Sequence, residues 1–142
     1  MQVIRFAVTD QEIADCFDCM LELRPHLVRD SFVPLVRHLN GLSGFQLAFL
    51  RDGKVRSVAG LRIGEWLCAG RYLEIEDLVS APDERSRGYG GALFDWLVAY
   101  AKRESCRELR LLSGVQRFAA HRFYMRKRMS ITAHYFSMTL EP

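Results

Sequence analysis

A strand pattern that leads into a glycine-rich loop and then into an amphipathic helix constrains the fold more than any other feature of this chain. Residues Tyr72 to Val79 predict the strand, and Pro82 ends it. The helix pattern covers Gly88 to Ser105, with apolar side chains on one stripe and charged side chains on the other. The loop and the start of the helix read Arg85-Ser86-Arg87-Gly88-Tyr89-Gly90-Gly91. Such a unit favours an α/β domain with one central sheet.

The glycine-rich junction is suited to bind an anion. Free N–H groups and the dipole at a helix N-terminus favour negative charge, and glycines let phosphate oxygens approach the backbone. Arg85 and Arg87 add charged donors. A P-loop needs Gly-Lys before Ser or Thr, and Gly53-Lys54 lies in a hairpin turn instead. A dinucleotide fingerprint needs a small residue where Leu93 stands. A P-loop and a dinucleotide site are therefore both less favoured than a site for another polyanion. The remaining alternative to an anion site is a plain surface loop.

Hydrophobic periodicity and turn signals predict the remaining elements. Thr9 and Glu12 form a capping box for a helix that Pro25 ends. The other expected segments are a strand over Gln2 to Val8, a helix over Asp30 to Leu39, strands over Phe45 to Leu50, Val55 to Ile63 and Leu109 to Leu112, a helix over Phe118 to Arg128 and a final strand over Ile131 to Leu140. We expect one domain over residues 1–142, a single mixed central β-sheet flanked by helices in the order β-α-α-β-β-β-α-β-α-β.

The composition argues against several classes of protein. Apolar residues make up 49% of the 142 residues, and the net charge of +3 is too small to indicate a nucleic-acid binder by itself. We expect no membrane span, because no apolar run approaches the ~20 residues that one needs. Cys16-x-x-Cys19 lacks a second pair of metal ligands, so we expect no metal site. Free thiols and the absence of a signal peptide pattern favour a cytoplasmic protein.

Two segments carry a resemblance to a known family. Arg85-Ser86-Arg87-Gly88-Tyr89-Gly90 fits the pattern Gln or Arg, two residues, Gly, one residue, Gly or Ala. Ala120-His121-Arg122-Phe123-Tyr124 fits the pattern Ala-x-x-Phe-Tyr farther along. With this order of elements, the sequence resembles the GCN5-related N-acetyltransferase (GNAT) family over nearly its whole length. It departs from the family at Arg128 and Met129, where Gly-Phe is common, and at Arg117, where Asn is common.

The resemblance implies a GNAT-like fold and an enzyme that uses acetyl-CoA as its co-substrate. Backbone amides from Arg87 to Gly91 would hold the pyrophosphate, and the main chain near Leu78 and Val79 would pair with the pantetheine arm. The implied cofactor-binding residues are Leu78, Val79, Arg85, Arg87, Gly88, Tyr89, Gly90, Gly91 and Arg117.

Three residues are candidates for acid–base catalysis. The resemblance implies that Tyr124 protonates the departing thiolate. Glu74 and Glu76 are two apart in the predicted strand and share one face, with Leu73, Ile75 and Val79 on the other. Carboxylates in a central strand indicate a wet cleft, so Glu76 is the favoured base and Glu74 the second choice. The alternative is a structural role, with both carboxylates facing a basic side chain such as Arg62.

The acceptor is the least determined part of the sequence. The resemblance implies that the stretch from Leu23 to Phe32 forms one wall of its site, and Glu74 and Glu76 favour a cationic amine. We expect a small-molecule amine, polyamine-like among others, or a peptide or protein amine, and neither a nucleic-acid nor a membrane partner; a homodimer stays open. One alternative is an acyl-CoA sensor without turnover. Another is a nucleic-acid binder that uses the cations from Arg122 to Arg128.

Overall fold

The computed structural model describes residues 1–82 and 87–141. They form two compact units, Met1–Arg110 and Leu111–Pro142. The first unit contains nearly all of a five-stranded sheet with the strand order β1-β2-β3-β4-β5. Its elements are β1 (Gln2–Phe6), α1 (Asp10–Asp15), α2 (Phe17–Leu23), α3 (Arg29–Ser43), β2 (Gln46–Asp52), β3 (Lys54–Trp66), β4 (Gly70–Ser80), α4 (Tyr89–Arg103) and β5 (Glu108–Leu111). The second unit contains α5 (Phe118–Arg126).

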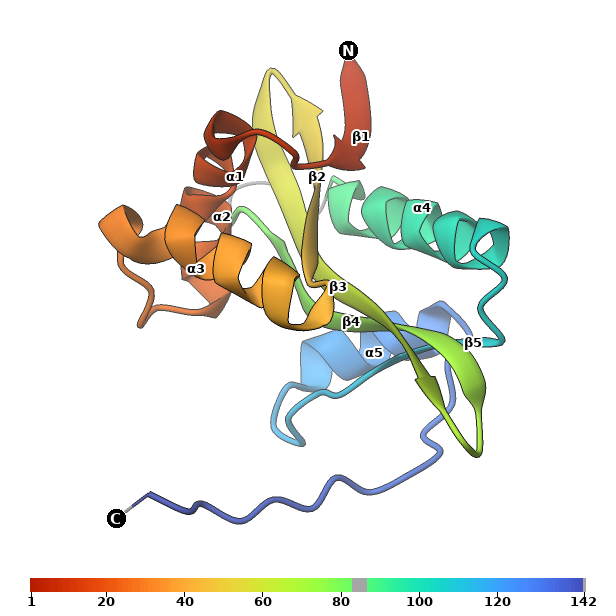
Figure 1. Ribbon diagram of the computed structural model, residues 1–142. Coiled ribbons are helices and arrows are strands. Elements are labelled where there is room, and N and C mark those ends of the chain that lie inside the picture. The colour runs from red at the N-terminus through yellow and green to blue at the C-terminus, as the bar shows by residue number, and fades with distance from the viewer. Residues whose placement is uncertain (83–86, 142) are drawn as a thin grey trace. The chain divides into compact units, whose positions relative to one another are not determined.

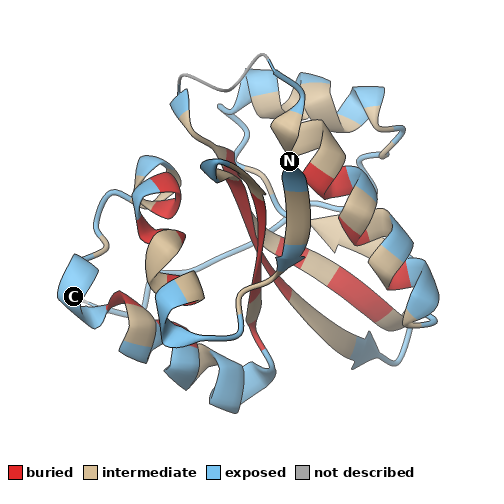
Figure 2. Cartoon of the chain, turned by 90° about the horizontal axis from the view of Figure 1, so that it is seen from above, coloured by how far each residue is buried: buried red, intermediate tan, exposed pale blue. Residues whose placement is uncertain are grey.

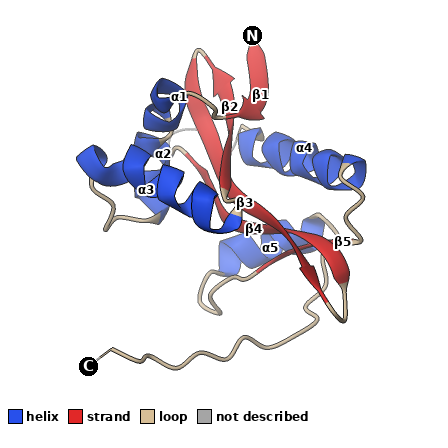
Figure 3. Cartoon of the chain, viewed as in Figure 1, coloured by secondary structure: helices blue, strands red, loops and turns tan. Residues whose placement is uncertain are grey.

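Helices of the first unit cover both faces of the sheet. Figures 1 and 3 show α1, α2 and α3 on one side of the central strands and α4 on the other. Strands β1 to β4 pair antiparallel in sequence order. Strand β5 lies next to β4, and α4 forms the crossover connection between these two strands. The buried residues follow the central strands and the inner sides of the helices on both faces of the sheet (Figure 2). The expected mixed sheet flanked by helices is confirmed.

Local signals in the sequence explain where several elements begin and end. The side chain of Thr9 accepts a hydrogen bond from the Glu12 amide at 3.1 Å, and Glu12 Oε1 accepts one from the Thr9 amide at 3.0 Å, so the predicted capping box is present. Gly53 turns β2 into β3 with a φ of +79°, a conformation that favours glycine. The predicted helix after Thr9 is divided at Cys16 into α1 and α2.

The final strand is the one predicted element that does not form. Residues 131–140 have no regular secondary structure, and every side chain among them is exposed. A strand gains its stability from hydrogen bonds to a neighbour and from a buried face, and this segment has neither in the described structure. The order of elements therefore ends with α5. Among the described residues, no helix is both long and apolar enough to cross a membrane.

Candidate active site

A β-bulge in β4 determines which side chains of the candidate site share a face. Asp77 pairs with Gly60, and Ile75 pairs with Leu61, so Glu76 is the extra residue on β4. A bulge leaves its extra residue unpaired and interrupts the alternation of the strand. The predicted base therefore stands at the one irregular position of this strand pair.

The bulge overturns the prediction that Val79 lies on the face opposite Glu74. Val79 pairs with Val58, and Glu74 pairs with Arg62. Val58 and Arg62 are four residues apart on the unbroken strand β3 and therefore share a face. Val79 consequently lies on the same face as Glu74 and belongs to the core cluster that α1, α2 and α3 cover. The prediction was wrong because Glu76 adds one residue to the alternation.

Carboxylates and guanidinium groups form a cluster on this face. Arg62 Nε donates to Glu76 Oε2 at 2.7 Å, and Arg62 Nη2 lies 3.7 Å from Glu74 Oε2. Arg110 Nε donates to Glu74 Oε1 at 2.8 Å. The hydrogen bond to Glu76 raises the pKa of Arg62, so this guanidinium stays charged. The structure thus brings Glu74 and Glu76 together on Arg62, as expected if the two carboxylates had a structural role.

The two glutamates differ in how firmly they are held. Both carboxylate oxygens of Glu74 face an arginine, and its side chain is 15% exposed. Glu76 has one oxygen in the pair with Arg62, and its side chain is 32% exposed. A proton acceptor needs a lone pair that can reach its substrate. The geometry therefore favours Glu76 over Glu74 as the group that meets an acceptor.

Two aromatic rings fix the far end of the cluster. The Arg110 guanidinium carbon lies 3.5 Å from the centre of the Tyr72 ring and 3.7 Å from the centre of the Trp66 ring. The two rings meet edge to face with centroids 5.9 Å apart. Cation–π contacts of this kind restrain a long side chain. Arg110, and with it the Glu74 carboxylate, is therefore held in place.

The N-terminus of α4 begins at a glycine in the left-handed region. Gly88 is the N-cap residue with a φ of +79°, and its carbonyl accepts a hydrogen bond from the Ala92 amide at 3.0 Å. Because glycine has no side chain, Gly88 supplies no side-chain cap to the first N–H groups of the helix. The Tyr89 hydroxyl donates to Asp52 Oδ2 at 3.0 Å and so ties this end of α4 to the β2–β3 hairpin. Arg87 is exposed, and Arg85 lies outside the described residues.

Gly90 and Gly91 form the first turn of α4 and are partly buried. A Cβ added at Gly90 would lie 3.1 Å from Ser80 Oγ, and this hydroxyl donates to Ser57 Oγ at 3.1 Å. The missing side chain at Gly90 therefore lets the helix approach the end of β4. This packing role is an addition to what the sequence predicted for Gly90.

Side chains already form hydrogen bonds to part of the main chain at the end of β4. The Val79 carbonyl accepts hydrogen bonds from Ser57 Oγ at 3.0 Å and from Cys19 Sγ at 3.5 Å. Leu78 pairs with Ala59 and is partly buried. Of the two residues predicted to meet a pantetheine arm, Leu78 is thus the one whose carbonyl accepts no side-chain hydrogen bond from the described residues.

In the second unit, Arg117 and Tyr124 lie against each other. Burial raises the pKa of Tyr124, and the guanidinium of Arg117, which hydrogen-bonds to the phenol, offsets part of that rise. Arg117 is the N-cap residue of α5, and Tyr124 lies in the last turns of the same helix. The Tyr124 ring meets Phe123 edge to face, with centroids 5.6 Å apart. A protonated phenol at neutral pH suits the predicted role as an acid.

Sequence reasoning assigned no individual role to Arg24, Asp77 or Arg110, although Arg24 belongs to the stretch expected to form one wall of the acceptor site. Arg24 Nε donates to Asp77 Oδ1 at 2.8 Å, and these residues are 53 positions apart in the chain. Arg110 and Glu74 are 36 positions apart. No local pattern reports a contact over such a separation, because each arginine alone is typical of a solvated surface.

The cysteine pair is structural. Cys16 and Cys19 are buried, and Cys16 Sγ donates to the Glu12 carbonyl at 3.4 Å. Burial raises the pKa of Cys16 to about 12, and a thiol that stays protonated is a poor nucleophile or metal ligand. No group of three or more His, Cys, Asp and Glu side chains in the described ranges is arranged to hold a metal ion.

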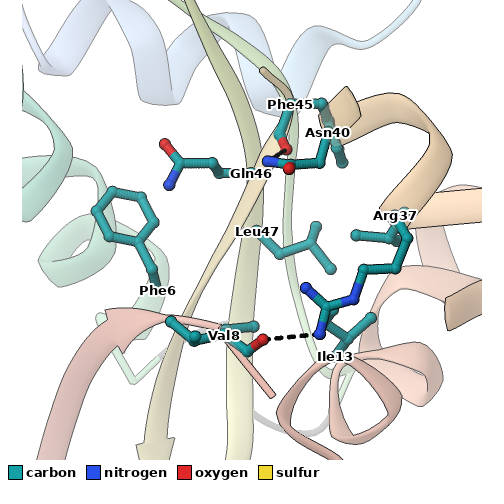
Figure 4. Close-up of a pocket in the computed structure, with 10 residues that line it drawn as sticks. Phe6, Val8, Ile13, Arg37, Asn40, Phe45, Gln46 and Leu47 are labelled. Carbon is teal, nitrogen blue, oxygen red and sulfur yellow. Dashed lines mark hydrogen bonds between the residues drawn. The ribbon is translucent and has the colours of Figure 1, made fainter. Parts of the chain in front are cut away.

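One cavity of the first unit lies away from these residues. It has a volume of about 220 Å³ between β1, α1, α3 and β2. Figure 4 shows Arg37 at its rim, with Nη2 donating to the Val8 carbonyl at 2.8 Å, and Asn40 donating to the Phe45 carbonyl at 3.0 Å. None of the residues that the sequence predicts for the site lines this cavity.

Known proteins match both the sequence and the fold. The model of the acetyltransferase (GNAT) family matches residues 11–129. The "Uncharacterized N-acetyltransferase YhdJ" of Bacillus subtilis (strain 168) is 30% identical over 118 residues, which cover 82% of this chain and 83% of that protein.

Among solved structures, aminoglycoside N-acetyltransferase AAC(6')-Iy in complex with CoA superposes with a TM-score of 0.84 at 13% identity, covering 98% of this chain and 94% of that one. Glucosamine-6-phosphate N-acetyltransferase from Arabidopsis thaliana has a TM-score of 0.78 at 16% identity, covering 99% of both chains. These two likenesses concern the fold. The family model and the sequence relative show more, namely that this chain belongs to the acetyltransferase (GNAT) family and is an acyl-CoA-dependent N-acetyltransferase with acetyl-CoA as its co-substrate.

Proposed function

We propose that this enzyme moves an acetyl group from acetyl-CoA directly to a primary amine of a small molecule or of a peptide. The observation that carries the proposal is the course of β4. This strand presents Glu76 at its bulge, and the chain after it leads to the N-terminus of α4, where Gly88 supplies no side-chain cap. One strand thereby connects a candidate base to a candidate anion site.

For the donor, we propose that the pyrophosphate binds to the backbone amides from Arg87 to Gly91. The helix dipole and the glycine N-cap, which has no side chain to compete for the N-terminal N–H groups, support this position. Arg85, which lies outside the described residues, would add charge from the loop. We assign the pantetheine arm mainly to the main chain of Leu78, because the Val79 carbonyl already accepts two hydrogen bonds.

For the chemistry, we propose one base and one acid. The Glu76 carboxylate takes a proton from the acceptor ammonium, directly or through a water molecule, and the free amine attacks the acetyl carbonyl. A carbon–nitrogen bond forms, the nitrogen loses its second proton to water, and the carbon–sulfur bond breaks. The Tyr124 phenol gives its proton to the departing CoA thiolate, and the phenolate that this leaves regains a proton from water. Burial that keeps this phenol protonated supports the second role.

The charge of the cluster bears on the acceptor. Glu74, Glu76 and Asp77 each pair with an arginine, namely Arg110, Arg62 or Arg24. Three negative charges therefore meet three positive ones, so these six side chains together carry no net charge. A polycation would gain little attraction here, so we propose an acceptor with a single amine in place of a polyamine-like one.

A second candidate function is an acyl-CoA sensor with little turnover. The ion pair between Arg62 and Glu76 favours it, because Arg62 occupies one oxygen of the carboxylate that would accept the proton. For either function we propose a single domain over residues 1–142. The four free cysteines support a cytoplasmic location.

Thermal melting followed by a turnover assay tests both candidates. Acetyl-CoA and CoA should raise the melting temperature, because a ligand that binds the native state stabilises it, and NAD and ATP should raise it much less. Equal stabilisation by ATP and CoA would refute a specific CoA site. An amine panel, read through release of free CoA thiol, then separates the two functions. Turnover with any amine supports the transferase, and CoA binding without turnover supports the sensor.

A further inference from the structure

Arg24 spans the bulge of β4 from the end of α2. It is the C-cap residue of that helix, and its Nη2 donates to the Glu76 carbonyl at 3.0 Å. Its Nε donates to Asp77 Oδ1 at 2.8 Å. One side chain thus contacts the bulged residue and the residue that follows it.

Both contacts satisfy groups that would otherwise be costly. The bulged residue of a strand has lost its regular partner, and a buried carbonyl without a hydrogen bond is destabilising. The Asp77 side chain is 14% exposed and packs against Gly60, where a Cβ would collide with Oδ2. A carboxylate in such a place needs a cation beside it. Arg24 supplies both the donor and the charge.

Glu76 is consequently fixed at two points. Arg24 holds its carbonyl, and Arg62 holds one oxygen of its carboxylate. The first of these arginines also begins the connection from α2 to α3, the stretch that the family resemblance makes one wall of the acceptor site.

We infer that Arg24 is a positioning residue, which sets the backbone of the β4 bulge and so aims the Glu76 carboxylate at the acceptor amine. This inference rests on the proposed function of Glu76 as the base. The inference predicts that Glu76 moves together with the connection from α2 to α3. Arg24 belongs to that connection, and its guanidinium binds the bulge that carries Glu76.

Arg24→Ala and Arg24→Lys test the inference, with Arg37→Ala as the matched control. Arg37 also binds one carboxylate, that of Asp10, and one backbone carbonyl, that of Val8, but it lies at the cavity of Figure 4 and away from β4. Arg24→Ala should lower kcat about tenfold, within the range that misplacement of a reacting group produces. The KM for acetyl-CoA should stay within about twofold, since the donor loop is untouched.

Two further readouts separate positioning from general destabilisation. The activity lost in Arg24→Ala should be greatest at low pH, as for Glu76→Gln, and methylguanidine in solution should restore part of it. Arg24→Lys should retain more activity than Arg24→Ala, because an ammonium can still pair with Asp77. Arg37→Ala should keep the wild-type kcat and pH profile. An equal loss of kcat in Arg24→Ala and Arg37→Ala, or no loss in either, overturns the inference.

Hydrogen exchange of backbone amides decides the matter without turnover. Arg24→Ala should speed exchange at the amides around Glu76 and Asp77, and Arg37→Ala should not. Unchanged exchange there contradicts a role for Arg24 in holding the bulge. A wild-type enzyme that acetylates no amine would instead refute the proposed function, and the exchange data would still show whether Arg24 fixes this segment.

Discussion

Arg62 Nε lies 2.7 Å from Glu76 Oε2, and the same guanidinium lies 3.7 Å from Glu74 Oε2. One cation therefore serves the two carboxylates that are candidates for the base. The pair restricts the rotation of the Glu76 side chain. The arrangement fixes the direction of the carboxylate oxygen that Arg62 does not bind.

Glu76→Gln should lower kcat/KM most at low pH. The acceptor amine is then mostly ammonium and depends on the base, whereas at high pH free amine is available without it. We expect a loss of about 10²-fold at the acidic end and partial recovery as the pH rises. A pH–rate profile of wild type and variant checks this. A variant profile with the wild-type shape would exclude Glu76 as the base.

Glu74→Gln should act on stability more than on chemistry. Both oxygens of Glu74 face arginines, and the side chains of Glu74 and Arg110 are 15% and 19% exposed. Loss of this charge leaves Arg110 without its partner, and we expect about 2 kcal/mol less stability. Urea unfolding measures the loss. If kcat/KM falls more in Glu74→Gln than in Glu76→Gln, the order of the two candidates is reversed.

Tyr124→Phe should lower kcat by about 10²-fold or more, the range for a positioned acid. The KM for acetyl-CoA should change little, because one hydroxyl contributes little to the binding of a large cofactor. Steady-state kinetics with a good amine acceptor provides the measurement. Normal turnover by the phenylalanine variant would remove Tyr124 from the mechanism.

Arg117→Met should raise the pKa of Tyr124 further. The guanidinium favours the phenolate and lowers the pKa, while burial raises it, so removal of the cation leaves burial unopposed. A phenol with a higher pKa gives up its proton less readily, and kcat should fall severalfold. NMR titration of ¹³C-labelled tyrosine reports the pKa directly, with Arg122→Met, a change on the same helix, as the control. A pKa that stays the same or falls would contradict the contact.

Gly90→Ala alone should weaken both packing and CoA binding, so the two effects need separate variants. The new Cβ would lie 3.1 Å from Ser80 Oγ. In the double variant Gly90→Ala with Ser80→Ala, that oxygen is gone, and stability should return toward the value for Ser80→Ala. Isothermal titration with CoA then measures what remains. If the CoA affinity of the double variant recovers together with its stability, Gly90 serves helix packing. If the CoA affinity stays low, the phosphate needs the open backbone at Gly90.

The sequence predicted the fold well wherever the signal is local. The capping box at Thr9, the turn at Gly53 and the long amphipathic pattern from Gly88 each depend on residues within a few positions of one another. The strand pattern from Tyr72 to Val79 also placed β4 within two residues at its start and one at its end. Periodicity reports such features because it reflects the geometry of a single element.

The sequence failed where the structure depends on distant partners. The alternation from Leu73 to Val79 gives no sign of the extra residue at Glu76, because a bulge is defined by the register with β3. The apolar residues of segment 131–140 suggested a strand, but strand formation needs a neighbour that the segment itself does not supply. The pairing of Arg24 with Asp77 is likewise visible only in three dimensions.

The buried thiol of Cys16 makes a prediction about alkaline pH. Burial raises its pKa from 9.0 to about 12, so the folded state binds this proton more tightly than the unfolded state does. A group with a raised folded pKa contributes stability that is fully present below pH 9.0 and is lost as the pH rises toward 12. Cys16→Ala lacks the titrating group, so its free energy of unfolding should fall less steeply over this range.

Urea unfolding of wild type and Cys16→Ala at several pH values measures the difference between the two slopes. The alanine variant should start less stable at neutral pH, because it leaves a small cavity in the core, and the gap should narrow above pH 9.0. A thiol-reactive dye adds an independent check. Cys68 is exposed and should react at once, whereas Cys16 and Cys19 are buried and should react only as the protein unfolds. Rapid reaction of Cys16 in the native protein would contradict both its burial and its raised pKa.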